Sequence, residues 1–126
     1  LKQITGTVPI IKAYAGMGIG DGIISLLAPE KIDGVVIEAL GAGNLPPLAA
    51  REIKSLMDKG VPVVLVSRCF NGIAEPVYAY EGGGVKLQEA GVMFIKELNA
   101  PKARLKLLIA LSAGLEGQEL KDYIEG

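Results

Sequence analysis

Four short apolar runs recur along the chain, and each has almost no alternation of polar with apolar residues. Runs of this kind predict strands that are buried on both faces, as in a parallel sheet. We expect the strands at Val8–Ala13, Val35–Leu40, Val61–Ser67 and Val92–Ile95. Segments with helical spacing, bounded by Gly, Pro or Asn, alternate with these runs. We expect helices at Gly22–Leu27, Pro47–Lys59, Gly83–Ala90, from Pro101 to about Leu111, and at Leu115–Ile124.

This alternation predicts the α/β class, with right-handed crossovers between parallel strands. We expect a single three-layer α/β/α domain over residues 1–126, with a four-stranded parallel sheet. Asn99 precedes Pro101 and is expected to cap the long helix that follows. Leu56, Leu108 and Ile109 are expected among the buried helix residues.

Composition excludes several classes of function. A formal charge of −1 predicts neither a nucleic acid nor an anionic membrane as partner. One cysteine and no histidine allow no internal disulfide and no ordinary zinc site, so we expect a cytoplasmic protein without a metal or other cofactor. No apolar run reaches the roughly 20 residues that a membrane-spanning helix needs. The chain begins at Leu1 rather than Met, which we interpret as the start of a fragment.

Two glycine-rich turns invite a nucleotide-binding interpretation, and neither fits it. In the segment 16–22 the third glycine of the dinucleotide fingerprint is replaced by Asp21, whose carboxylate would repel a pyrophosphate. In the segment 41–46 the corresponding position is Pro46. A receiver domain is also excluded, because its third strand would end in an aspartate and this one ends in Ser67, Arg68 and Cys69.

Polar residues follow the second and third strands, at the edge of a parallel sheet where ligands gather. Asn44 is interpreted either as a side chain held outward by the preceding glycines or as an Asx-turn or helix cap before Pro46. Cys69 is either a small buried hydrophobe or part of a site with Arg68. Tyr80 either covers a site or packs on the sheet edge.

Four segments then resemble, in order and spacing, the carboxy-terminal domain of bacterial L-asparaginases, in particular the cytoplasmic, type I-like members. They are DGVVIEALGAGNLPP, VPVVLVSRCFNG, AYEGGG and LNAPKARLKLLIALS. The resemblance implies hydrolysis of L-asparagine to L-aspartate and ammonia through an acyl-enzyme on a threonine of a larger amino-terminal domain. Thr5 and Thr7 are the only threonines here, and neither lies in a catalytic motif of that family. We therefore expect no catalytic residue in this chain and no activity from the chain alone.

The resemblance also implies roles for individual residues. In the family, active sites form between the subunits of a homodimer or homotetramer, and the asparagine of the G-x-G-N turn enters the neighbouring pocket; Asn44 matches that position. Tyr80 matches a substrate-binding residue of the type I members. Glu75 and Glu81 are weaker candidates for holding the α-ammonium group of the substrate.

A regulatory role is a further possibility raised by the resemblance. Some cytoplasmic members bind asparagine at an allosteric site, and Cys69 matches a residue of that site, beside Arg68. Glu38 stands where an arginine would help to hold the carboxylate of the effector, which speaks against such regulation here. Two alternatives stay open: the asparaginase-like subunit of a tRNA-dependent amidotransferase, and a non-catalytic asparagine-binding module.

Overall fold

The computed structural model describes residues 3–14, 16–17, 24, 27–41, 43–67 and 81–126. Its strands are β1 (Ile10–Lys12), β2 (Val35–Ala39), β3 (Val63–Ser67) and β4 (Met93–Phe94). Its helices are the 3-10 helix η2 (Pro29–Lys31) and the α-helices α1 (Pro47–Asp58), α2 (Gly84–Ala90), α3 (Ala100–Ser112) and α4 (Gly117–Glu125).

The four described strands form one parallel sheet in the order β1-β2-β3-β4, which confirms the predicted sheet. Ile37 in β2 lies beside Ile11 of β1 and Leu65 of β3. The observed strands are shorter than the apolar runs, most of all β1 and β4. The apolar runs are buried over a greater length than they pair as strands: Val8 and Ile95 are buried although they lie outside β1 and β4.

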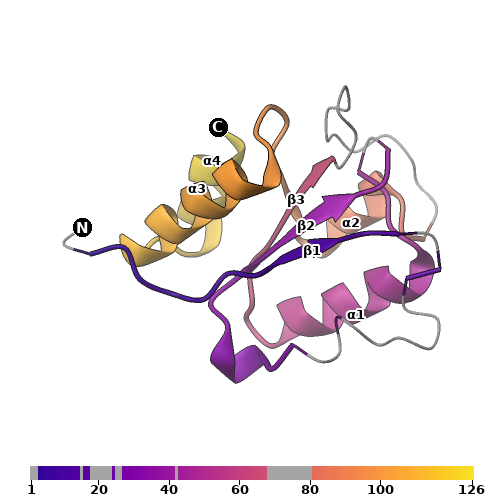
Figure 1. Ribbon diagram of the computed structural model, residues 1–126, viewed down its shortest axis with the longest axis horizontal. Coiled ribbons are helices and arrows are strands. Elements are labelled where there is room, and N and C mark those ends of the chain that lie inside the picture. The colour runs from indigo at the N-terminus through magenta and orange to yellow at the C-terminus, as the bar shows by residue number, and fades with distance from the viewer. Residues whose placement is uncertain (1–2, 15, 18–23, 25–26, 42, 68–80) are drawn as a thin grey trace.

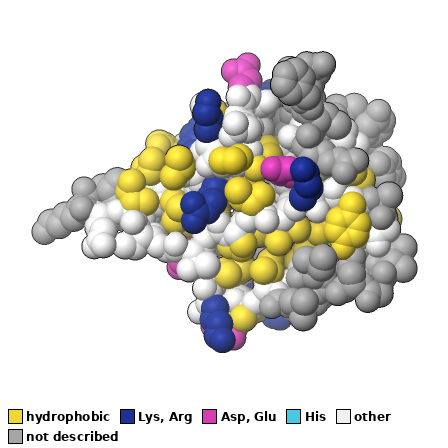
Figure 2. Space-filling model, in the orientation of Figure 1, with side chains coloured by type: hydrophobic (Ala, Val, Ile, Leu, Met, Phe, Trp, Pro, Cys, Tyr) yellow, Lys and Arg dark blue, Asp and Glu magenta, His cyan; other side chains and the backbone are white. Residues whose placement is uncertain are grey.

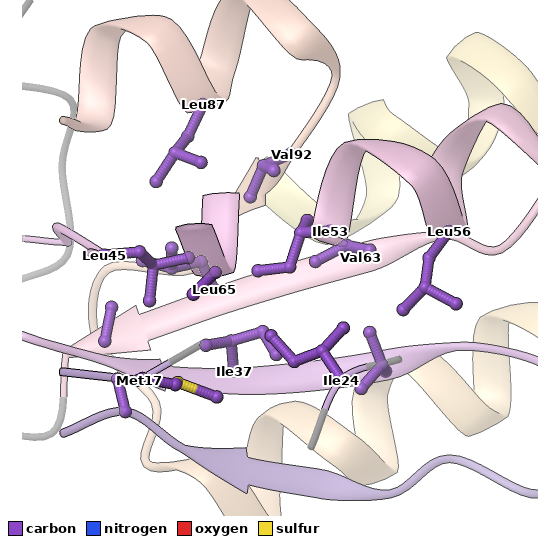
Figure 3. Close-up of a cluster of buried hydrophobic side chains, with 14 of the residues drawn as sticks. Met17, Ile24, Ile37, Leu45, Ile53, Leu56, Val63, Leu65, Leu87 and Val92 are labelled. Carbon is purple, nitrogen blue, oxygen red and sulfur yellow. The ribbon is translucent and has the colours of Figure 1, made fainter. Parts of the chain in front are cut away.

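Helices cover both faces of the sheet, so the three-layer α/β/α prediction is confirmed (Figure 1). Side chains of β2 alternate between the faces: Val35 and Ile37 pack toward α1 and α2, whereas Val36 packs toward α3 and α4. Figure 3 shows the first of these cores, in which Ile53 of α1 and Leu87 of α2 point toward Ile37 and Leu65 of the sheet. Both central strands are thus buried on both faces over most of their length, as their largely apolar runs predicted.

Most of the helix predictions hold within one or two residues, and one burial prediction is wrong. The carboxamide of Asn99 accepts a hydrogen bond from the Lys102 N–H (3.0 Å), so the predicted cap is present. Leu56 and Leu108 are buried, but Ile109 is only half-buried because α3 turns Ala103, Leu107 and Ala110 toward the sheet. The helix expected at Gly22–Leu27 falls mostly outside the described residues.

The two edges of the sheet differ. At β4 the Glu125 carboxylate of α4 accepts a hydrogen bond from the Phe94 N–H (2.9 Å), which satisfies an edge donor. At β1 no element of the described residues pairs with the outer edge. Hydrophobic side chains lie on the face of the molecule that Figure 2 shows. Ile10 of β1 and Leu105 of α3 are exposed. In the described part of the chain, no helix is long and apolar enough to cross a membrane.

Candidate functional site

A tight turn at the carboxyl end of β2 carries Asn44. The Leu40 N–H donates a hydrogen bond to the Asn44 carbonyl (2.9 Å), and the Asn44 N–H donates to the Leu40 carbonyl (2.8 Å). These two bonds form an isolated antiparallel bridge, so the chain reverses within four residues. The strands in Figure 1 point toward this end of the sheet, where α1 also begins. The backbone of Asn44 is therefore fixed relative to β2.

Gly43 allows this turn to lie close to the sheet. Its φ of 121° lies in the region that favours glycine, and a Cβ at this position would stand 2.8 Å from the Phe94 ring and 3.0 Å from Leu65. A larger residue would have to push the turn away from β3 and β4. The glycine thus brings Asn44 against the carboxyl edge of the central strands.

Ser67, the last residue of β3, connects the two neighbouring strand ends. Its hydroxyl donates a hydrogen bond of 2.6 Å to the Gly41 carbonyl, in the turn that follows β2. The sequence placed Ser67 among the polar residues at this edge without assigning it a partner. The structure gives it a role in holding the Asn44 turn beside β3.

The Asn44 side chain does not cap α1. The N-cap of that helix is Pro46, and no side chain caps it. Pro46 and Pro47 both lack an N–H, so the first two positions beyond Leu45 offer no donor to the Asn44 carboxamide. Among the described residues, nothing hydrogen-bonds this partly buried carboxamide. Within the described part of the chain, both the donor and the acceptor atoms of this carboxamide are thus unpaired.

Glu81, a candidate for holding an ammonium group, is occupied by an arginine of this same chain. The Arg51 Nε donates to Glu81 Oε1 (2.6 Å), and Nη2 donates to Oε2 (3.1 Å). These hydrogen bonds lower the pKa of Glu81 and raise that of Arg51. Arg51 could not be predicted from the sequence, because it lies 30 residues from its partner and belongs to no motif.

The polar residue Glu38 also has an internal partner. Its carboxylate lies 3.9 Å from Lys12 Nζ, and the register of the sheet places these two residues side by side on β2 and β1. A cross-strand ion pair accounts for a glutamate at this position without an effector.

The remaining site predictions cannot be placed. Arg68, Cys69, Glu75 and Tyr80 lie outside the described residues. In the part of the chain that is described, no group of acidic or cysteine side chains is arranged to hold a metal ion.

The two threonines lie at the opposite end of the strands from Asn44. Thr7, ahead of β1, donates its N–H to the Asp33 carboxylate (2.7 Å), just before β2 begins. The Thr5 N–H donates to the Ser112 hydroxyl at the end of α3 (3.0 Å). Neither threonine therefore belongs to the site around Asn44.

Comparison with known proteins gives a consistent result. Residues 7–124 match the family described as "Glutaminase/Asparaginase C-terminal domain". A "Probable L-asparaginase" of Deinococcus radiodurans is 46% identical over 114 residues, which are 90% of this chain and 34% of the relative. A glutamyl-tRNA(Gln) amidotransferase component of Pyrococcus furiosus is 33% identical over 90% of this chain and 25% of the relative.

A solved structure agrees with these relatives. The "L-asparaginase I" of Vibrio cholerae superposes with a TM-score of 0.79 at 28% identity, over 98% of this chain and 37% of that one. The chain thus spans about a third of the length of these asparaginases. The fold, the sequence match and the resemblance read from the motifs agree, and the chain belongs to the glutaminase/asparaginase C-terminal domain family.

Proposed function

We propose that this domain completes the active site of an L-asparaginase, which hydrolyses L-asparagine to L-aspartate and ammonia. The observation that carries the proposal is the state of Asn44. Its backbone N–H and carbonyl both hydrogen-bond to Leu40, whereas its carboxamide has no partner among the described residues. The relatives named as L-asparaginases and the matching family support the reaction class.

The chemistry assigns this domain a supporting role. Hydrolysis through an acyl-enzyme needs a nucleophile, which an amino-terminal domain would supply as a threonine. The carboxamide of Asn44 offers two N–H donors and one carbonyl acceptor. It can donate to an oxygen of the substrate or accept from the hydroxyl of the threonine, and either bond would orient the reacting groups.

The proposal includes an assembly. Asn44 lies at the carboxyl end of β2, and its carboxamide has no partner among the described residues, so we infer that another domain completes the pocket around it. We place that domain in a neighbouring subunit of a homodimer or homotetramer, in a cytoplasmic enzyme. L-Asparagine and L-aspartate would be its ligands, and no cofactor takes part.

A second candidate is the asparaginase-like subunit of a tRNA-dependent amidotransferase. The amidotransferase relative of Pyrococcus furiosus, similar over 90% of this chain, favours it. The two functions differ in what the full-length protein requires. A free asparaginase needs only asparagine and water, whereas an amidotransferase component passes ammonia on within a complex that holds tRNA.

The test is ammonia release from free asparagine. We expect the full-length protein to release ammonia without tRNA or any second protein, and the 126-residue chain alone to release none. Thr5 and Thr7 are bonded at the far end of the strands, so neither threonine of the isolated chain can act as the nucleophile beside Asn44. A requirement for tRNA would favour the amidotransferase, and release by the isolated chain that Asn44→Ala abolishes would overturn the proposal.

A further inference from the structure

A second turn, Glu81–Gly83, lies against the segment that leaves Asn44. The Leu45 N–H donates a hydrogen bond of 2.7 Å to the Gly82 carbonyl. Gly82 has a φ of 89°, and a Cβ added there would overlap the Leu45 carbonyl oxygen. Only glycine allows this approach of the two backbones. The residue that follows Asn44 is thus held by a turn far away in the sequence.

An ion pair fixes this second turn on α1. Arg51 lies one helical turn after Pro47, and both ends of its guanidinium fork bind the Glu81 carboxylate. Two parallel hydrogen bonds restrict the orientation of a carboxylate far more than a single contact does. Both side chains are exposed, so the pair contributes little to the stability of the fold. Its effect is geometric: it holds the residue next to Gly82.

These contacts form a chain that ends at Asn44. Arg51 holds Glu81, Gly82 holds the Leu45 N–H, and Leu45 is bonded covalently to Asn44. The opposite side of Asn44 is held by the bonds to Leu40. The position of the Asn44 backbone, and with it the direction of the Cα–Cβ bond that carries the carboxamide, therefore depends on anchors on both sides: the turn after β2, which Ser67 also holds, and the Glu81–Gly83 turn.

We propose that Arg51 and Glu81 are positioning residues, whose ion pair orients the Asn44 carboxamide through the Gly82–Leu45 contact. Neither residue touches the substrate in this proposal. The inference rests on the proposed role of Asn44 and adds two residues to it. It also gives Glu81 a role different from holding the ammonium group of the substrate.

The test uses steady-state kinetics of the full-length enzyme with asparagine. Asn44→Ala should impair either kcat or KM, and Arg51→Gln and Glu81→Gln should each impair the same parameter. We expect a loss of about tenfold, because a shift of about 1 Å can cost about a hundredfold and the loss of this exposed pair should move Asn44 by less. The exchanged pair, Arg51→Glu with Glu81→Arg, should recover most of the loss. Lys86→Gln is the matched control, since Lys86 pairs with Glu89 on the exposed side of α2 (3.6 Å) and should leave the kinetics unchanged.

A double-mutant cycle distinguishes positioning from other effects. If the ion pair acts through Asn44, Arg51→Gln should have no further effect in an Asn44→Ala enzyme. The inference would be overturned if the losses of activity from Arg51→Gln and Asn44→Ala were additive in the double mutant. It would also be overturned if Asn44→Ala were impaired while Arg51→Gln and Glu81→Gln kept the kinetics of the Lys86→Gln control. In these last two cases the proposed function stands. Wild-type kinetics of Asn44→Ala would instead overturn the proposed role of Asn44 and this inference together.

Discussion

At the scale of single residues, Asn44 combines a fixed backbone with a side chain that has no partner among the described residues. The bonds to Leu40 hold its main chain, while the prolines at 46 and 47 deprive its carboxamide of the donors that an N-cap would bind. Asparagine in a turn commonly bonds its own backbone. Within the described residues no such side-chain bond forms, which supports the proposed role of the carboxamide between domains.

Asn44→Ala in the full-length enzyme should raise the activation free energy by about 1–3 kcal/mol, the range for losing one oriented hydrogen bond. The loss should appear in kcat if the carboxamide orients the threonine, and in KM if it only holds substrate. Asn44→Asp should be more damaging, because it adds a negative charge near the carboxylate of the substrate. The melting temperature should change little, since the side chain makes no bond within the described residues. Wild-type kinetics with a melting temperature lower by several degrees would make Asn44 a turn residue only.

At the scale of elements, the helices on the two faces are held by packing, and their ends differ in capping. Asn99 caps α3 through its side chain, whereas Glu116, the N-cap residue of α4, makes no capping bond. The Asn99 cap supports the helix that packs across the sheet with Ala103 and Leu107. Its removal should therefore affect the stability of the whole fold.

Asn99→Ala should lower the free energy of unfolding by about 1 kcal/mol, the usual cost of losing an N-cap bond. Glu116→Ala is the control and should cost clearly less, because no capping bond is lost. Urea denaturation measures both, and the slope of free energy against urea should be the same for all three proteins. Equal urea midpoints for Asn99→Ala and Glu116→Ala would contradict the prediction that the Asn99 cap stabilises the fold.

At the scale of the whole molecule, the ion pair between α1 and the Glu81–Gly83 turn predicts a dependence of stability on pH. Its hydrogen bonds lower the pKa of Glu81 below the ordinary 4.5, so the folded state binds the proton less readily than the unfolded state. The contribution of the ion pair to the stability of the fold is fully present above the pKa that Glu81 has in the unfolded state. It is lost as the pH falls through the lower pKa that Glu81 has in the folded state.

Glu81→Gln should therefore be less stable than wild type at neutral pH, by a small amount because the pair is exposed. The difference should shrink as the pH falls below 4.5. Thermal melts of both proteins across the acid range measure it, and Arg51→Gln should show the same convergence. A difference that stays constant down to the most acidic sample would contradict the assigned pairing.

The amino-acid sequence by itself determined the architecture and the family. Largely apolar runs such as 35–40 and 61–67 predict buried parallel strands. The Asn99 cap can be predicted because its partner, the Lys102 N–H, lies only three residues away. These signals are local: they depend on residues within a strand or a helical turn. Four motifs in order, including the one around Asn44, indicated the family, and the family match over residues 7–124 confirms it.

The tertiary structure decided how the site is assembled. Arg51 meets Glu81 across 30 residues, and Gly82 approaches Leu45 only because the sheet brings both turns to one end. Ile109 was expected to be buried and is half-buried, since helical periodicity does not determine which apolar residue of α3 lies over the sheet and which lies at its flank. Contacts between distant segments depend on how elements pack, and no pattern within one segment encodes them.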